Sequence, residues 1–129
     1  MTWSRISAMV GEMNLYFAYG PNLDKERMRE CCPSAEPASR AVLKNYKLDF
    51  TRYSPRTGGG LADVVPATGE EVWGGVYRLS DQDLDALDLQ EGCPVLYRRT
   101  RVSVESDDGA ILHAWTYEIV HKRSYVPPT

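Results

Sequence analysis

The sequence predicts an α+β domain in which two short helices accompany a curved, mainly antiparallel sheet or small barrel. Six or seven segments have the short, apolar or alternating composition of strands, and two have helical spacing. The clearest turn signal is Asp107-Asp108-Gly109, which predicts a hairpin between strands at 97–105 and 110–120. No repeat or linker divides the chain, so we expect a loose extension at 1–12 and one domain at 13–129.

The first predicted element is a strand followed by a tight loop and a helix. Residues 15–19 are apolar or aromatic and predict a buried strand, which Gly20, Pro21 and Asn22 end at once. Residues 24–30 are good helix formers with acidic side chains early, as a helix start prefers. Such a loop can point backbone N–H groups at an anion. A plain strand-to-helix turn has the same pattern, so the loop alone does not specify a ligand.

The middle of the chain reads as four strands joined by turns and one loop. The strands are expected at 36–43, 46–53, 61–67 and 71–79. Lys44-Asn45 predicts a turn between the first two, and residues 54–60 predict a loop with a glycine triplet. Gly74-Gly75 lies inside the last strand, where a glycine pair predicts a bulge or a close approach of another backbone.

The second helix, expected at 80–90, presents the most informative acidic residue. Leu84, Leu87 and Glu91 share one helix face, so Glu91 continues an apolar stripe and is expected to point inward. Ser80 is a good N-cap for this helix, with Asp83 three residues on. Glu91 precedes an expected glycine C-cap at Gly92. Burial and the helix C-terminus both disfavour an ionised carboxylate, so the pKa of Glu91 is expected to rise toward that of a general base. A frayed last turn that leaves Glu91 in solvent is the alternative.

Composition excludes several classes of protein. The formal charge of −3 argues against general binding to nucleic acid. No apolar run reaches the ~18–20 residues of a membrane span. The three cysteines comprise adjacent Cys31-Cys32 and the odd Cys93, a usage that indicates a reducing compartment, and we expect the protein to be cytoplasmic.

Other residues that carry chemistry give weaker signals. Cys93 has no histidine nearby in the sequence, so we expect a half-buried small residue. His113 and His121 are expected on one face of the last strand, but two histidines without a third ligand do not predict a metal site. Gly58-Gly59-Gly60 lacks the Lys-Ser/Thr ending of a phosphate loop. The arginines of 98–101 alternate along a strand, which predicts solvated edges or one guanidinium for a substrate carboxylate.

Four blocks of the sequence resemble the γ-glutamylcyclotransferase family. Tyr19-Gly20-Pro21-Asn22-Leu23 resembles the family's Tyr-Gly-Ser-Asn-Leu loop, and residues 45–50, 70–77 and 87–97 resemble its later blocks in the same order. The resemblance runs from about residue 13 to residue 128. It implies a compact mixed barrel with a cavity beside the first loop. It also implies that Glu91 is the catalytic glutamate and that Tyr97 is a pocket tyrosine.

The implied reaction is the cyclisation of a small γ-glutamyl amide to 5-oxoproline, with release of an amine or amino acid. The resemblance implies that Glu91 moves the proton, that the N–H groups around 19–23 hold a carboxylate or oxyanion, and that Tyr97 hydrogen-bonds in the pocket. Intramolecular attack can carry effective molarities of ~10⁵–10⁸ M, so orientation and proton transfer are the main tasks. No metal or cofactor is required. A binding protein that keeps the cavity without catalysis is the alternative function.

Two departures from the family pattern bear on this expectation. Pro21 stands where the family has serine, which removes a hydroxyl and a backbone N–H donor. The sequence also ends at Pro127-Pro128-Thr129, where the family usually continues into a further segment. We therefore expect either a more open pocket or one completed by a second subunit in a homodimer.

Overall fold

The structure is a computed structural model that describes residues 14–54 and 58–122. The expected extension at 1–12 and the closing Pro127-Pro128-Thr129 lie outside the described residues. Within the part that is described, no helix has both the length and the apolar character needed to cross a membrane.

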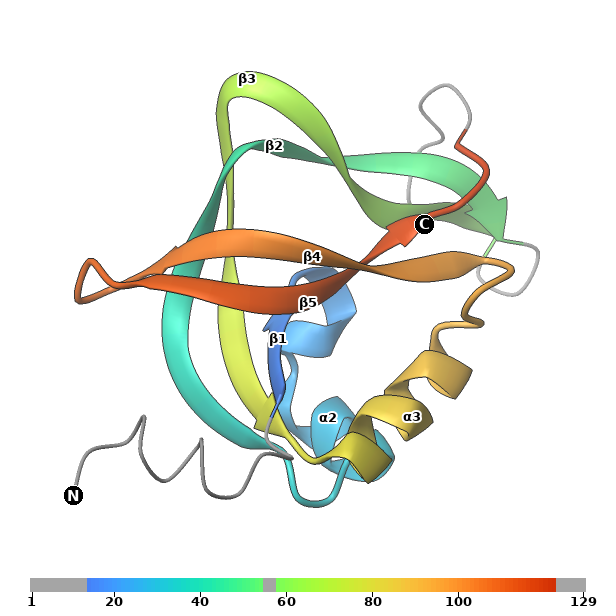
Figure 1. Ribbon diagram of the computed structural model, residues 1–129. Coiled ribbons are helices and arrows are strands. Elements are labelled where there is room, and N and C mark those ends of the chain that lie inside the picture. The colour runs from blue at the N-terminus through green and yellow to red at the C-terminus, as the bar shows by residue number, and fades with distance from the viewer. Residues whose placement is uncertain (1–13, 55–57, 123–129) are drawn as a thin grey trace, which may run out of the picture.

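The described residues form a closed five-stranded barrel with two α-helices and one 3-10 helix (Figure 1). In chain order the elements are β1 (Asn14–Ala18), η1 (Gly20–Leu23), α2 (Lys25–Cys31), β2 (Glu36–Ser54), β3 (Gly59–Leu79), α3 (Asp81–Gln90), β4 (Tyr97–Ser106) and β5 (Ile111–Ile119). The strand order is β1-β3-β2-β4-β5, and the neighbours are antiparallel except at the β1–β5 closure. The prediction of a mixed, mainly antiparallel barrel is confirmed.

The predicted turn at Lys44-Asn45 is wrong, because β2 continues through it. Asn45 has a left-handed backbone with φ 65°, and the pairing register with β3 shifts between Lys44 and Tyr46. The side-chain oxygen of Asn45 accepts a hydrogen bond from the N–H of Gly69 at 3.0 Å, so the irregularity is fixed across both strands. A bulge bends a strand without ending its ladder. Four predicted strands therefore merge into two long, curved ones, visible as β2 and β3 in Figure 1.

Buried side chains form two apolar clusters, and β1 contributes to both. One cluster joins Phe17 and Tyr19 to apolar residues of the other strands. The second joins Tyr16 and Ala18 to side chains of α2 and α3, which Figure 1 shows near one another beside β1. Successive residues of a strand point to opposite faces, so this division follows the period of two. Burial on both faces explains why residues 15–19 form a continuous apolar run.

The closure of the barrel between β1 and β5 depends largely on side chains. The described backbone pairing there is parallel and is limited to Tyr16 opposite Trp115. Two side-chain hydroxyls reinforce it. Thr116 Oγ1 donates to the carbonyl of Phe17 at 2.8 Å, and the hydroxyl of Tyr19 donates to the carbonyl of Tyr117. Both hydroxyls are buried, so each bond satisfies groups that water does not reach.

Gly74 confirms the predicted close approach of two backbones. A Cβ at Gly74 would lie 2.3 Å from the carbonyl oxygen of Ala18 and 2.8 Å from the ring of Phe17. At Gly75 the nearest atom, Cδ2 of Leu23, is 3.5 Å away, which is ordinary contact. We expect Gly74→Ala to destabilise the fold by about 1–3 kcal/mol, because backbone must shift, and the matched Gly75→Ala to be neutral or slightly stabilising. Urea unfolding measures both; equal midpoints for the two variants would contradict this packing.

Candidate functional site

The strand–loop–helix unit at the N-terminal side of the barrel forms as the sequence predicts. Gly20 starts η1 with φ 64°, a conformation that side chains disfavour, and a Cβ there would lie 3.4 Å from Cβ of Ala62. Asp24 caps α2, its side chain accepting a hydrogen bond from the N–H of Glu26 at 2.9 Å. The loop is therefore anchored to α2 on one side and lies against β3 on the other. Pro21 and Asn22 lie within η1.

Glu91 lies directly at the end of α3. The helix begins with the predicted cap, since the side chain of Ser80 accepts from the N–H of Asp83 at 3.1 Å. Glu91 is the C-cap residue, with its N–H bonded to the carbonyl of Leu87 at 3.0 Å, and Gly92 follows with φ 68°. The residue is half-buried, and its negative charge raises the pKa of both Tyr19 and Tyr97. Its carboxylate is thus electrostatically coupled to two predicted site tyrosines.

The two tyrosines reach the site from different strands. Tyr97 opens β4, and its hydroxyl donates to the carbonyl of Ala62 at 2.7 Å. Tyr19 follows β1 and donates to the carbonyl of Tyr117. Burial is the largest cause that raises the pKa of each hydroxyl, and neighbouring negative charges raise it further. Both are therefore neutral hydrogen-bonding groups around pH 7.

The predicted site residues divide between two places on the barrel. Gly20 and the hydroxyl of Tyr97 both contact Ala62 of β3, and the charge of Glu91 acts on Tyr19 and Tyr97. Leu23, at the far end of η1, instead lines a groove of about 420 Å³ over β2 and β3. A cavity beside the first loop is thus present, but the described residues that line it do not include Glu91 or Tyr97.

Asp63 is a buried carboxylate that the sequence did not single out. Its side chain is fully buried, and it accepts hydrogen bonds from four donors. These are the N–H groups of Val64 and Ile119, both at 2.9 Å, the hydroxyl of Thr51 at 2.8 Å and the ammonium of Lys122 at 2.9 Å. Its charge also raises the pKa of Tyr19 and Tyr97. The available signal was one acidic residue inside the apolar run 61–65.

Arg27 is a further charged residue that acts on Tyr97. From the sequence it was expected only to favour a helix. It lies in α2, and its positive charge lowers the pKa of Tyr97 against the effects of burial, Glu91 and Asp63. A cation and a carboxylate thus act on the same tyrosine hydroxyl.

The weaker candidates have structural surroundings. Cys93 is half-buried as predicted, and it and the adjacent pair Cys31-Cys32 are free thiols. His113 contacts the hydroxyl of Ser103 at 3.1 Å, whereas His121 lies beyond the end of β5, so their shared strand face was a wrong prediction. The N–H of Val120 still bonds to the carbonyl of Leu96 at 3.0 Å, one residue past the last strand pair, and His121 follows it. No group of three or more metal-ligating side chains occurs among residues 14–54 and 58–122.

The arginines of β4 lie on both faces of the strand, as alternation predicts. Arg98 pairs with Glu118 at 3.5 Å. Arg99 pairs with Asp88 of α3 at 3.2 Å, and its guanidinium lies 4.7 Å from the ring centre of Trp115. Arg99 therefore ties α3 to the β4–β5 hairpin.

The buried tyrosines predict how stability depends on pH. Burial raises the pKa of Tyr19, Tyr97 and Tyr117 above the ordinary value of 10.0. Above pH 10 the unfolded chain loses these protons first and binds fewer protons than the folded one, so stability falls as pH rises. We expect full stability below pH 10, and tyrosinate absorbance from these three residues only as the fold is lost. Spectroscopic titration beside circular dichroism checks this; ionisation of all tyrosines with the fold intact would contradict it.

Comparison with known proteins now identifies the family. The sequence model of the family described as "Gamma-glutamyl cyclotransferase, AIG2-like" matches residues 16–128, which is nearly the whole described barrel. The chain belongs to the γ-glutamyl cyclotransferase family. It is 38% identical to the γ-glutamylcyclotransferase of Bos taurus over 124 residues and 36% identical to that of Mus musculus over 122 residues. A solved structure titled "Gamma-glutamyl cyclotransferase" superposes with a TM-score of 0.85 at 34% identity.

The γ-glutamyl cyclotransferase relatives are longer than this chain. The matches cover 92% of this chain and 65% of the Bos taurus protein, and 91% and 65% for Mus musculus. For the solved structure the shares are 92% of this chain and 72% of that chain. The shared part is the γ-glutamyl cyclotransferase barrel, with the first loop and the helix that ends at Glu91.

Proposed function

We propose that this chain cyclises small γ-glutamyl amides, giving 5-oxoproline and a free amine or amino acid. The observation that supports this best is the half-buried carboxylate of Glu91, coupled to Tyr19 and Tyr97 at the end of α3. A carboxylate in such surroundings suits proton transfer, and the Gly20 loop next to it suits anion binding. The Bos taurus and Mus musculus relatives are named γ-glutamylcyclotransferases, which agrees with this reaction class.

In the proposed reaction the substrate's own α-amine is the nucleophile. Its ammonium first loses a proton to Glu91, and the free amine then attacks the γ-carbonyl carbon. A new C–N bond closes the five-membered lactam, and the attacking nitrogen then loses its second proton. The original amide C–N bond breaks as Glu91 passes the two protons in turn to the departing nitrogen, which leaves as an ammonium. Atoms and charges balance without a co-reactant. A positioned carboxylate of this kind contributes typically ~10²–10⁴ in rate.

Binding and orientation fall to the groups around Glu91. The N–H groups of η1 would hold the substrate's carboxylate or the developing oxyanion, assisted by the positive charge of Arg27. Pro21 contributes no N–H, so the loop offers one donor fewer than one with serine there. Tyr97 and Tyr19, held neutral by burial, would serve as hydrogen-bonding groups beside Glu91. We place the activity in a reducing, cytoplasmic compartment, which the free cysteines favour.

A panel of γ-glutamyl amino acids and γ-glutamyl amines tests the proposal. Each is incubated with the protein, and mass spectrometry measures 5-oxoproline against a reaction without protein. Product from one or more members supports the reaction class and names the leaving amine. Calorimetric binding without product from any member would overturn catalysis in favour of a binding protein.

A further inference from the structure

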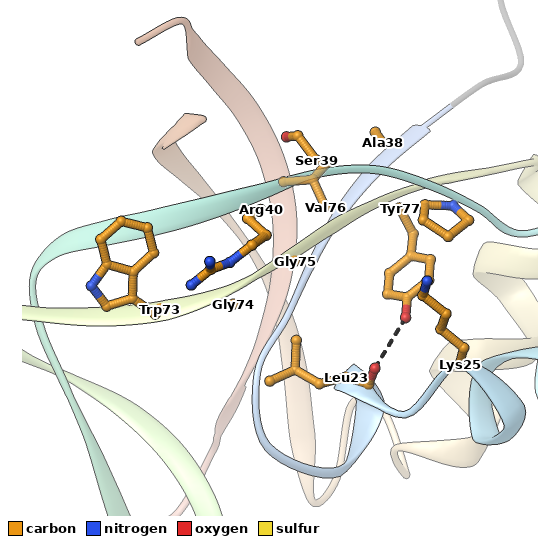
Figure 2. A pocket seen from close by; sticks show the side chains of 11 residues that line it. Leu23, Lys25, Ala38, Ser39, Arg40, Trp73, Gly74, Gly75, Val76 and Tyr77 are labelled. Carbon is orange, nitrogen blue, oxygen red and sulfur yellow. Dashed lines mark hydrogen bonds between the residues drawn. The ribbon is translucent and has the colours of Figure 1, made fainter. Parts of the chain in front are cut away.

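A groove outside the proposed catalytic site lies over the paired strands β2 and β3, beside the end of η1 (Figure 2). Its volume is about 420 Å³, within the ~300–1,000 Å³ that small-molecule sites occupy. The lining residues that set its shape and charge are Leu23, Lys25, Arg40, Trp73, Gly75 and Tyr77. They come from η1, α2, β2 and β3.

The floor of the groove is open at Gly75, which has no side chain to fill it. Gly75 has an ordinary strand conformation, and a Cβ there would meet only Cδ2 of Leu23 at 3.5 Å and a carbonyl at 3.9 Å. Aromatic rings stand on either side, Trp73 with 51% of its surface exposed and Tyr77 with its hydroxyl bonded to the carbonyl of Leu23 at 3.3 Å. The exposed ring of Trp73, the open strand at Gly75 and the edge of the mostly buried Tyr77 suit a flat apolar body.

Two cations border this apolar floor. Figure 2 shows Arg40 beside Trp73 and Lys25 beside Tyr77, on opposite sides of Leu23. The Arg40 guanidinium lies 5.5 Å from the ring centre of Trp73. Neither cation forms an ion pair with a carboxylate among the described residues. Asp24 is the nearby acid, and its side chain caps α2.

The charges of the groove contrast with those of the whole chain. The protein carries a formal charge of −3, so its overall field does not favour anions. Lys25 and Arg40 therefore make the groove locally positive on a chain whose net charge is negative. Together with the open apolar floor, this local charge favours an anion with a flat apolar body over a cation.

We propose that this groove is a second ligand site, separate from Glu91, that takes a small aromatic carboxylate. The aromatic body lies over Gly75 between Trp73 and Tyr77, and the carboxylate is held by Arg40 or Lys25. The groove does not contain the proposed catalytic residue, since Glu91 and Tyr97 do not line it, and of the described residues only Leu23 at the end of η1 borders both sites.

Indole-3-propionate tests the proposal on the full chain, with indole-3-propionamide as a neutral match and acetate as a match without the aromatic body. Nitrogen–proton correlation spectra follow the indole N–H of Trp73, assigned by Trp73→Phe. We expect saturable shifts at Trp73 with a dissociation constant at or below about 1 mM, and at least about tenfold weaker binding of the amide and of acetate. Equal binding of acid and amide, shifts confined to Trp115, or no saturation would overturn the site.

Variants distinguish the groove from general anion binding. Gly75→Leu fills the floor, and the double variant Lys25→Gln with Arg40→Gln removes the charge while leaving the groove open. Each is expected to weaken indole-3-propionate binding at least about tenfold, whereas the control Lys47→Gln, an exposed cation elsewhere on β2, changes it less than about twofold. If Gly75→Leu does not fold, the double variant decides. Unchanged affinity in a folded double variant would contradict the proposal.

Discussion

Replacing Glu91 with glutamine is expected to abolish 5-oxoproline formation and leave the barrel folded. Glutamine keeps the volume of the side chain at the end of α3 but cannot accept and return the proton of the α-amine. The expected loss is at least about 10²-fold in turnover, the lower end of what a positioned base contributes. Substrate affinity, measured by calorimetry, is expected to change much less, because the binding groups of the loop are intact.

Asp85→Asn is the matched control for this experiment. Asp85 lies on the same helix and is exposed, so neutralising it changes the charge of α3 without touching the site. Its turnover is expected to equal that of the unaltered protein, and thermal unfolding shows whether either variant loses stability. A Glu91→Gln protein that is as active as the unaltered one would end the proposed mechanism. A Glu91→Gln protein that does not fold would show a structural role instead.

Removing the carboxylate of Asp63 is expected to give the largest loss of stability. Asp63→Ala leaves the N–H groups of Val64 and Ile119 and the hydroxyl of Thr51 without their acceptor. Breaking a buried, hydrogen-bonded ion pair by removing one partner typically costs about 3–5 kcal/mol. Guanidinium chloride unfolding measures this directly.

The controls for Asp63 separate the network from the loss of any one carboxylate. Asp49→Ala removes a half-buried aspartate of β2 whose lysine partner lies 4.0 Å away, and it is expected to cost less than about 1 kcal/mol. Thr51→Val removes a single donor and is expected to cost about 1 kcal/mol. Asp63→Ala with a midpoint like that of Asp49→Ala would show that the network contributes little.

Local signals in the sequence predicted the ends of elements well. Ser80 and Gly92 bracket α3 because capping depends on residues within one turn of the helix end. The Asp107–Gly109 turn joins β4 to β5 for the same reason. The prediction of a turn at Lys44-Asn45 was wrong because bulges and turns have similar residue preferences. Only pairing with Gly69, 24 residues away, distinguishes the two.

The site was predictable only in part, for a related reason. The spacing of Leu84, Leu87 and Glu91 is visible within one helix, and it indicated the carboxylate that is coupled to two tyrosines. The partners of Asp63 lie 12, 56 and 59 residues away, so one charge in an apolar run gave no sign of its network. Arg40 and Lys25 lie on opposite sides of one groove only because folding brings β2 and α2 together.

The closure between β1 and β5 has a consequence for motion. β1 pairs with β3 through five residues but with β5 through one, so β1 is expected to separate from β5 before it separates from β3. Tyr19 bonds across that line and is coupled to Glu91 and Tyr97. Brief separation of the two strands would therefore loosen Tyr19 and its coupling to Glu91 and Tyr97 while β2 and β3 stay paired. If Glu91 acts as proposed, this opening between β1 and β5 would also admit the substrate.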